Sequence, residues 1–319
     1  MKRYAIGIDL GGTKILTALV DRFNGKVVHF VKKKTKNAKG SENIYNKMVE
    51  SIRDLIGEID IPANEIGSIG VGAAGQIDRE NGILIAAPNL DCFDFNIKER
   101  IQDEFAIPVY VGNDVEIAAL GEMKFGSAMD CDDFVCVFVG TGVGSSIVKG
   151  GKIIKGATGT AGEIGHMIVD VNGRPCNCGA HGCLEAYASR TAIEKRIEGA
   201  LRKGRPSVIS EYLESGKPIT SGMIRKSIMR DDELVKQSVD EAADYLSAGL
   251  ASVINLINPK LIILGGGLIE AVDYFYETTI KKAKTKCLPV PATKIEFKKA
   301  RLGDFSGVIG AAFLEERDR

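Results

Sequence analysis

Three cysteines lie within eight residues of one another in the segment CNCGAHGCLE, residues 176–185. Cys176, Cys178 and Cys183 could form a disulfide, respond to oxidants or bind a metal ion. A disulfide framework is not expected, because the chain has seven cysteines, an odd number, and cytoplasmic thiols are kept reduced. The two-residue spacing of a thioredoxin-type pair is missing, although clustered thiols do oxidise and redox sensing stays an alternative. Because thiolates at this spacing can share one Zn²⁺, we favour a zinc site.

A structural zinc site needs about four sulfur or nitrogen ligands at roughly 2.0–2.3 Å, so a fourth ligand is required. His166 is the first candidate and His181 the second. Glu163 precedes His166 by three residues, and Glu185 follows the last cysteine by two. An ion that holds His166 and the cysteines would also fix both carboxylates, which could then accept hydrogen bonds from sugar hydroxyls. The alternative is that both glutamates are exposed salt-bridge partners. We expect a structural zinc that shapes a sugar pocket and takes no part in the chemistry.

Asp114 lies where an expected strand meets an alanine-rich helix, in the segment IPVYVGNDVEIAALGEMKFG, residues 107–126. A carboxylate at this position often caps the helix N-terminus, which is the structural alternative. The carboxyl end of a strand in an α/β protein is also a usual place for catalytic groups. The glycine turns described next favour a general base for a hydroxyl nucleophile.

Three glycine-rich turns follow expected strands. DLGGTK (9–14) and GTGVGS (140–145) offer backbone N–H groups that suit phosphate oxygens, and a triple glycine stands at 265–267. Asp9 adds a carboxylate suited to water-mediated Mg²⁺ binding. The alternative is a set of tight turns without a ligand. The turns lack the Gly-Lys-Ser/Thr of a Walker A motif, and the first runs into a strand, unlike a dinucleotide-binding turn. They favour a nucleotide bound at strand ends.

The elements that must position these residues alternate between strands and helices, so the sequence predicts an α/β protein. Two similar strand–turn–strand segments, 4–21 and 134–151, indicate an internal duplication. Helical periodicity covers 43–59 and 232–258, and the second of these helices is followed by Pro259 and a buried strand.

Length and composition limit the possible functions. The chain has 319 residues, which indicates two domains, and we place them at 1–115 plus 296–319 and at 116–295. Lys and Arg number 42, as do Asp and Glu, so nothing favours nucleic acid or anionic membranes as partners. The apolar stretch before Asp9 is too short for a signal peptide, and no run of 18 apolar residues predicts a membrane span. A cytoplasmic location is expected.

These motifs together resemble the ROK family of sugar kinases and repressors, within the actin/hexokinase superfamily. DLGGTK, GNDVEIAALGE, GTGVGSSI, GEIGH, CNCGAHGCLEAYAS and GGGL occur in the family's order along the whole chain. The resemblance implies two ribonuclease-H-like domains flanking a cleft and a homodimer. GEIGH and CLEAYAS are most similar to bacterial-type glucokinases.

The resemblance also implies roles for individual residues. Asp114 matches the catalytic base, and the matching zinc ligands are His166, Cys176, Cys178 and Cys183. The hexose would be held by Asn89, Asn113, Asp114, Glu163, His166 and Glu185. ATP and Mg²⁺ would be bound by Asp9, Gly11, Gly12, Thr13, Lys14, Gly140, Thr141, Gly142, Gly144, Gly265, Gly266 and Gly267, with the adenosine at the last three.

The implied reaction is transfer of the γ-phosphoryl group of ATP to the 6-hydroxyl of a hexose, with glucose expected first. Kinases for N-acetylglucosamine, N-acetylmannosamine, fructose or allose are alternatives. One loop departs from the glucokinase pattern, because Asp91, Cys92 and Phe93 stand where a Gly-Trp pair is common. A sugar-responsive repressor is the second class, which we discount because the first strand begins at Tyr4, without a preceding helix-turn-helix segment.

Overall fold

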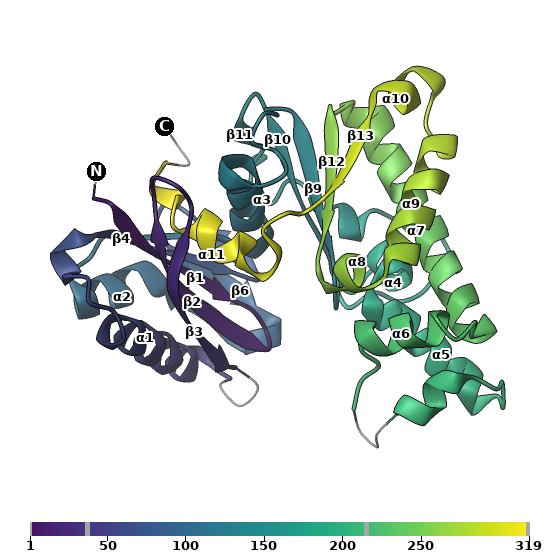
Figure 1. The fold of residues 1–319 in the computed structure, drawn as a ribbon, viewed down its shortest axis with the longest axis horizontal. Helices are drawn as coiled ribbons and strands as arrows, with labels where there is room; N and C mark the ends of the chain where they lie inside the picture. The colour runs from purple at the N-terminus through teal and green to yellow at the C-terminus, as the bar shows by residue number, and fades with distance from the viewer. Residues whose placement is uncertain (1, 36–38, 214–216, 317–319) are drawn as a thin grey trace. The chain divides into compact units, whose positions relative to one another are not determined.

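The computed structural model describes residues 2–35, 39–213 and 217–316. Its contacts divide the chain into two compact units (Figure 1). The first unit consists of Met1–Asp132, Val148–Ala161 and Arg301–Arg319. The second unit consists of Asp133–Ile147 and Gly162–Ala300.

The first unit is built on a five-stranded sheet with the order β3-β2-β1-β4-β8. Its strands are β1 (Tyr4–Leu10), β2 (Lys14–Asp21), β3 (Val27–Lys34), β4 (Ile66–Ala73) and β8 (Val109–Asn113). The first three strands form an antiparallel meander, whereas β1, β4 and β8 are parallel. The parallel strands therefore end at one edge, and the Asp9 and Asn113 ends of their strands meet there.

Side chains alternate between the two faces of this sheet, as strand geometry requires. Ile6 and Ile8 belong to the core under helix α1 (Ser41–Gly57), together with residues of α2 (Ile97–Phe105). Ala5 points to the opposite face, where it packs with residues of α3 (Asp114–Phe125) and α11 (Ser306–Ala311). Each face of the sheet thus has its own helical layer.

Glycines allow α11 to lie directly on the sheet and on α3 (Figure 1). A Cβ atom on Gly7 would lie 1.8 Å from the carbonyl oxygen of Val308, and one on Gly310 would lie 1.6 Å from that of Ile117. Real Cβ atoms do not come so close to backbone, so only glycine fits these crossings.

The buried carboxylate of Glu122 at the end of α3 holds the C-terminal segment in the first unit. It accepts hydrogen bonds from the backbone N–H groups of Arg301 and Leu302 at 3.0–3.1 Å and from the Ser306 hydroxyl at 3.1 Å. Such charge-assisted bonds offset the desolvation of the carboxylate. The chain therefore joins the first unit from Arg301 onward.

A small antiparallel sheet completes the first unit. It contains β5 (Gln76–Asp78), β6 (Ile83–Ala87) and β7 (Cys92–Asn96), in that order. The 3-10 helix η2 (Pro88–Leu90) connects the last two strands.

The second sheet has the order β11-β10-β9-β12-β13. Its strands are β9 (Phe134–Val139), β10 (Val143–Lys149), β11 (Lys152–Ile153), β12 (Leu261–Gly265) and β13 (Glu296–Lys299). Strands β9, β12 and β13 are parallel, and β10 and β11 are antiparallel. The strand order and the three parallel strands repeat those of the first sheet, as the predicted internal duplication requires, and the predicted α/β class is confirmed.

The α-helices of the second unit are α4 (Glu185–Ala188), α5 (Arg190–Arg202), α6 (Ser221–Ile228), α7 (Glu233–Ile257), α8 (Gly267–Ala271), α9 (Asp273–Lys286) and α10 (Pro289–Lys294). The remaining 3-10 helices of the chain are η1 (Ala63–Glu65), η3 (Ile164–His166), η4 (Val208–Tyr212), η5 (Gly303–Phe305) and η6 (Leu314–Glu316). Helix α7 confirms the helix predicted over 232–258.

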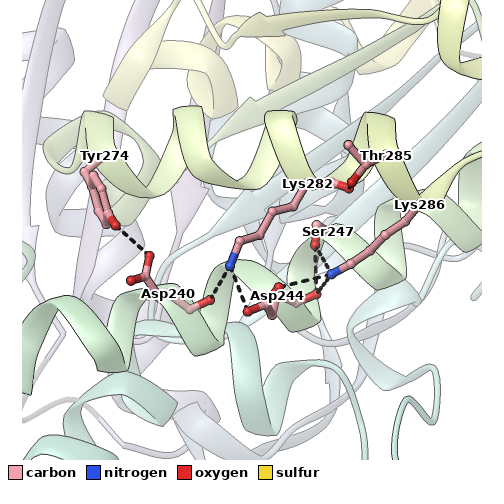
Figure 2. A network of polar contacts seen from close by, with 7 residues as sticks. All are labelled: Asp240, Asp244, Ser247, Tyr274, Lys282, Thr285 and Lys286. Carbon is pink, nitrogen blue, oxygen red and sulfur yellow. Dashed lines mark hydrogen bonds and ion pairs between the residues drawn. The ribbon is translucent and has the colours of Figure 1, made fainter.

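Polar side chains join α7 to α9 along their contact (Figure 2). The Tyr274 hydroxyl donates to Asp240 at 2.7 Å. Lys282 contacts the Asp244 carboxylate at 2.8 Å, and Lys286 contacts the Ser247 hydroxyl at 2.7 Å. The outer rim of this helix pair is therefore polar, whereas its inner side belongs to the core.

The domains expected from the sequence are 1–115 plus 296–319 and 116–295, and this division stays a prediction. The bounds of the two compact units are different. Residues 116–125 lie in the first unit because α3 packs against α11. Residues 296–299 lie in the second unit because β13 pairs with β12. Within the described parts of the chain, no helix is long and apolar enough to cross a membrane.

Candidate functional site

Four predicted metal ligands gather in the second unit. One ligand atom from each of His166, Cys176, Cys178 and Cys183 lies within 4.8 Å of the other three. The Sγ atoms of Cys178 and Cys183 are 3.7 Å apart, and His166 Nδ1 is 3.8 Å from Cys176 Sγ. Ligands at about 2.3 Å from a tetrahedral ion stand about 3.8 Å from one another. The cluster therefore fits a zinc ion, and His181 is not part of it.

The thiols of this cluster ionise unequally. A hydrogen bond from the Ala180 N–H lowers the pKa of Cys178 to about 7. Burial, with the neighbouring thiols, raises the pKa of Cys183 to about 12. Three thiolates at contact distance repel one another, and a divalent cation between them removes that cost. The donor set thus has the chemistry of a structural zinc site.

Short backbone contacts form the loop that carries the cysteines. Cys183 forms a bridge with Ile168, and His181 forms one with Pro175. Gly182 has a φ of 78°, and a Cβ atom there would lie 1.7 Å from the Asp170 carbonyl oxygen. Only glycine permits this turn, so the residue before the last cysteine is required for the cluster to close.

Glu185, two residues beyond the cluster, reaches the turn between β9 and β10. Its Oε2 atom accepts a hydrogen bond from the Val143 N–H at 2.9 Å. A Cβ atom on Gly142 would lie 2.3 Å from the same oxygen. The predicted sugar ligand therefore already holds the predicted phosphate-binding turn. Sequence reasoning assigned these two residues to different ligands and missed their contact.

The start of α5 holds the other side of this turn. The Arg190 N–H donates to the Gly140 carbonyl at 2.8 Å, and the Thr191 hydroxyl donates to the Thr141 carbonyl at 2.8 Å. Within the turn, the Gly140 N–H donates to the Gly142 carbonyl at 2.9 Å. Gly144 lies just inside β10. The turn is thus fixed before any ligand binds.

The triple glycine stands at the end of β12. Gly266 has a φ of 88°, and a Cβ atom there would lie 2.6 Å from the Val139 carbonyl oxygen. A Cβ atom on Gly265 would lie 2.6 Å from the Phe138 ring, whereas around Gly267 the described residues leave open space. The first two glycines let β12 approach the end of β9, and the third leaves backbone accessible at the start of α8.

In the first unit, Asp114 begins α3, and Asn113 caps the helix. The Asn113 side-chain oxygen accepts from the N–H groups of Val115 at 2.9 Å and of Glu116 at 3.3 Å. Asn113 Nδ2 also donates to the Gly75 carbonyl at 3.3 Å. Asp114 Oδ1 accepts from the Val115 N–H at 3.0 Å. The N-cap of α3 is therefore Asn113, and not Asp114, for which the sequence analysis considered that role.

Asp114, Lys14 and Asp304 all lie close enough to Asp9 to act on its charge. The pKa of Asp9 is raised to about 7, first by burial and then by the Asp114 carboxylate, while Lys14 lowers it. Lys14 Nζ lies 2.9 Å from Asp304 Oδ2, and this contact lowers the pKa of Asp304. A divalent cation would favour the ionised form of Asp9. Sequence reasoning missed Asp304, because no local pattern marks a residue so distant along the chain.

Replacing Asp9 with asparagine should stabilise the ligand-free protein above pH 7. Since the pKa of Asp9 is about 7 in the folded state and about 3.9 in the unfolded chain, folding stability falls as pH rises between these values. The stability gained by Asp9→Asn, measured by urea unfolding, should be about 3 kcal/mol larger at pH 8 than at pH 5. An equal gain at both pH values would contradict the raised pKa.

The remaining predicted ligands lie on exposed segments. Asn89 is exposed on η2, and its Cβ would be 3.9 Å from a Cβ on Gly12, so it borders the first turn. In that turn the Gly11 N–H donates to the Lys14 carbonyl, and the Thr13 carbonyl accepts from Thr35 N–H, both at 3.0 Å. In the second unit, Glu163 is exposed directly before η3, which carries His166.

The ROK family matches residues 5–318 of the chain. A glucokinase of Halalkalibacterium halodurans is 33% identical, over 98% of this chain and 94% of that protein. The crystal structure of a ROK family glucokinase from Streptomyces griseus in complex with glucose and AMPPNP is 29% identical, with a TM-score of 0.84 and 98% of each chain covered.

A regulator of the same family is also similar. The crystal structure of a ROK family transcriptional regulator, a homologue of the E. coli MLC protein, is 26% identical with a TM-score of 0.86. The match covers 98% of this chain and 78% of the regulator. The similarities confirm the expected fold class, and they include both kinases and regulators.

Proposed function

The chain belongs to the ROK family, and we propose that it transfers the γ-phosphoryl group of ATP to the 6-hydroxyl of a hexose, with glucose as the first substrate. The observation that carries this proposal is the position of Asp114. It lies at the end of a parallel strand and the start of α3, with helix capping performed by Asn113. Its carboxylate is close enough to Asp9 to raise the pKa of that group.

In this proposal Asp114 accepts the proton of the 6-hydroxyl as the bond to phosphorus forms. Phosphoryl transfer has a loose transition state, so alignment and charge neutralisation contribute most of the acceleration. Asp9 would help to hold the Mg²⁺ that accompanies ATP, and the ion would supply charge neutralisation at the phosphates. Lys14 and the turns at 11–13 and 140–142 are the proposed phosphate ligands. The glycines at 265–267 receive the adenosine.

The hexose hydroxyls would be bound by acceptors that the zinc site orders. Zinc supplies rigidity when bound and takes no part in the reaction. His166 directs Nδ1 towards Cys176, which leaves Nε2 for a sugar hydroxyl. Glu185 holds the turn at Gly142 through its Oε2 atom, so a sugar on its other oxygen would be linked directly to the phosphate-binding turn. Asn89, Asn113 and Glu163 are the other proposed ligands.

The loop after Asn89 bears on which hexose is bound. Asp91 is in the left-handed conformation with a φ of 54°, Cys92 is fully buried, and the Phe93 side chain is exposed. The buried thiol anchors this loop without the bulk of a tryptophan side chain. We place glucose before the N-acetyl sugars, fructose and allose because the similar proteins include the two glucokinases described above.

The proposal is tested by ADP release with ATP and Mg²⁺ on a panel of hexoses. We expect turnover with glucose to exceed turnover with every other sugar, and ADP release without sugar to be slower by at least about 100-fold, because sugar completes the site. Repeating the assay with polyphosphate or another nucleotide in place of ATP identifies the preferred phosphoryl donor. No sugar-dependent ADP release on the panel, together with sugar-sensitive binding to DNA, would instead indicate a regulator.

A further inference from the structure

Arg79 makes two polar contacts that the proposed reaction does not yet use. Its Nε atom donates to Glu116 Oε2 at 2.8 Å, and its Nη1 atom donates to the Gly159 carbonyl. The side chains of Arg79 and Glu116 are only 14% and 3% exposed. A buried ion pair with fixed geometry is strongly directional, and losing one partner leaves an uncompensated charge. Arg79 is therefore held rigidly between two segments.

The first of these segments carries the proposed base. Glu116 is the third residue of α3, and its side chain accepts from the Asn113 N–H at 3.4 Å, completing a capping box with Asn113. The capping box sets where α3 begins, and Asp114 is its first residue. The position of the Asp114 carboxylate thus depends on the Glu116 side chain that Arg79 holds.

The second segment is the loop that contains Gly159. Gly159 has a φ of 78°, and a Cβ atom there would lie 2.4 Å from Arg79 Nη1. A side chain at this position would displace the guanidinium, so loop and arginine fit one another closely. This loop connects β11 to η3; its residues 156–161 belong to the first unit, and the chain continues through Gly162 to Glu163.

We propose that Arg79 is a positioning residue, which sets the proposed base Asp114 and the 156–161 loop in one fixed relation for hexose binding. The proposal rests on the proposed function. Arginine suits this role because its planar fork donates in two directions, whereas lysine presents one compact ammonium group. Hexose turnover should therefore depend on Arg79, and ATP binding should not.

The test compares Arg79→Met and Arg79→Lys with Arg53→Met, which removes an exposed arginine paired with Glu104. For Arg79→Met we expect kcat/KM for the hexose to fall about 30- to 300-fold, with KM for ATP changed less than about threefold. The kcat/KM of Arg79→Lys for the hexose should exceed that of Arg79→Met by less than about tenfold, because lysine restores the charge but not the planar, two-directional donor group. The Arg53→Met variant should stay within about twofold of wild type.

Hydrogen exchange at the start of α3 gives a readout that does not need activity. The Val115 and Glu116 amides should exchange at least about tenfold faster in Arg79→Met than in Arg53→Met, because the capping box loosens. Unchanged exchange, or hexose kinetics within twofold of wild type in a folded Arg79→Met, would overturn the proposal. If Arg79→Met does not fold, Arg79→Lys is judged by the same two measurements. If the wild-type protein shows no hexose turnover, the proposed function is contradicted. The hydrogen-exchange comparison then still tests whether Arg79 positions the start of α3.

Discussion

Asp114→Asn is expected to lower kcat by about 10²–10⁴-fold, the usual contribution of a general base. Asparagine has the size of aspartate but accepts no proton at neutral pH. The fold should be unchanged, because Asn113 and Glu116 cap α3. KM for the hexose should change less than kcat, since the amide still hydrogen-bonds the 6-hydroxyl. The measurement is steady-state ADP release at saturating glucose and ATP.

The matched control for this prediction is Asp103→Asn, which makes the same change at an exposed position of α2. It should keep wild-type kcat. Thermal unfolding of both variants checks that the loss belongs to chemistry and not to folding. If Asp114→Asn kept kcat within about threefold of wild type while folded, Asp114 would not be the base.

Cys178→Ser is expected to remove zinc and to raise KM for the hexose by about 100-fold or more. Cys178 is an exposed member of the four-ligand cluster, so the serine itself causes little strain. A neutral hydroxyl is a far weaker zinc ligand than a thiolate. Without the ion, Glu163, His166 and Glu185 lose their fixed positions, and each sugar hydrogen bond then costs the ordering of its side chain.

Zinc content is the direct readout for this variant, independent of activity. Elemental analysis of protein purified without chelator should give about one zinc per wild-type chain and about none in Cys178→Ser. Cys287→Ser is the control. Cys287 follows directly after α9, is not one of the four cluster residues, and donates to the Ala283 carbonyl, as a serine can. A wild type that contains no zinc, or a Cys178→Ser variant with normal hexose KM, would contradict the proposal that zinc orders the sugar ligands.

Features encoded by short stretches of chain could be predicted from sequence. The hairpins at 4–21 and 134–151 follow from β-branched residues flanking glycines, and α7 follows from its apolar spacing and the proline behind it. The cysteine cluster is predictable because three of its ligands lie in one loop and zinc chemistry limits the fourth. In each case the information lies within about 25 residues of chain.

Contacts between distant residues could not be predicted in the same way. Lys14 meets Asp304, Arg79 meets Glu116 and Gly159, and Glu122 holds the backbone at Arg301. Each contact depends on how separate elements pack, and no spacing in the sequence marks it. The bounds of the two compact units likewise depend on long-range packing, since α3 packs on α11.

The central claim is that Asp114 directs the γ-phosphoryl group of ATP to the 6-hydroxyl of a hexose. Phosphorus NMR of a reaction with ATP, Mg²⁺ and glucose tests it most directly. We predict one new phosphomonoester signal that matches glucose 6-phosphate, formed in equal amount to ADP and at least about 100-fold more slowly with Asp114→Asn. Free phosphate as the main product, or a phosphoester at another hydroxyl, would contradict the account.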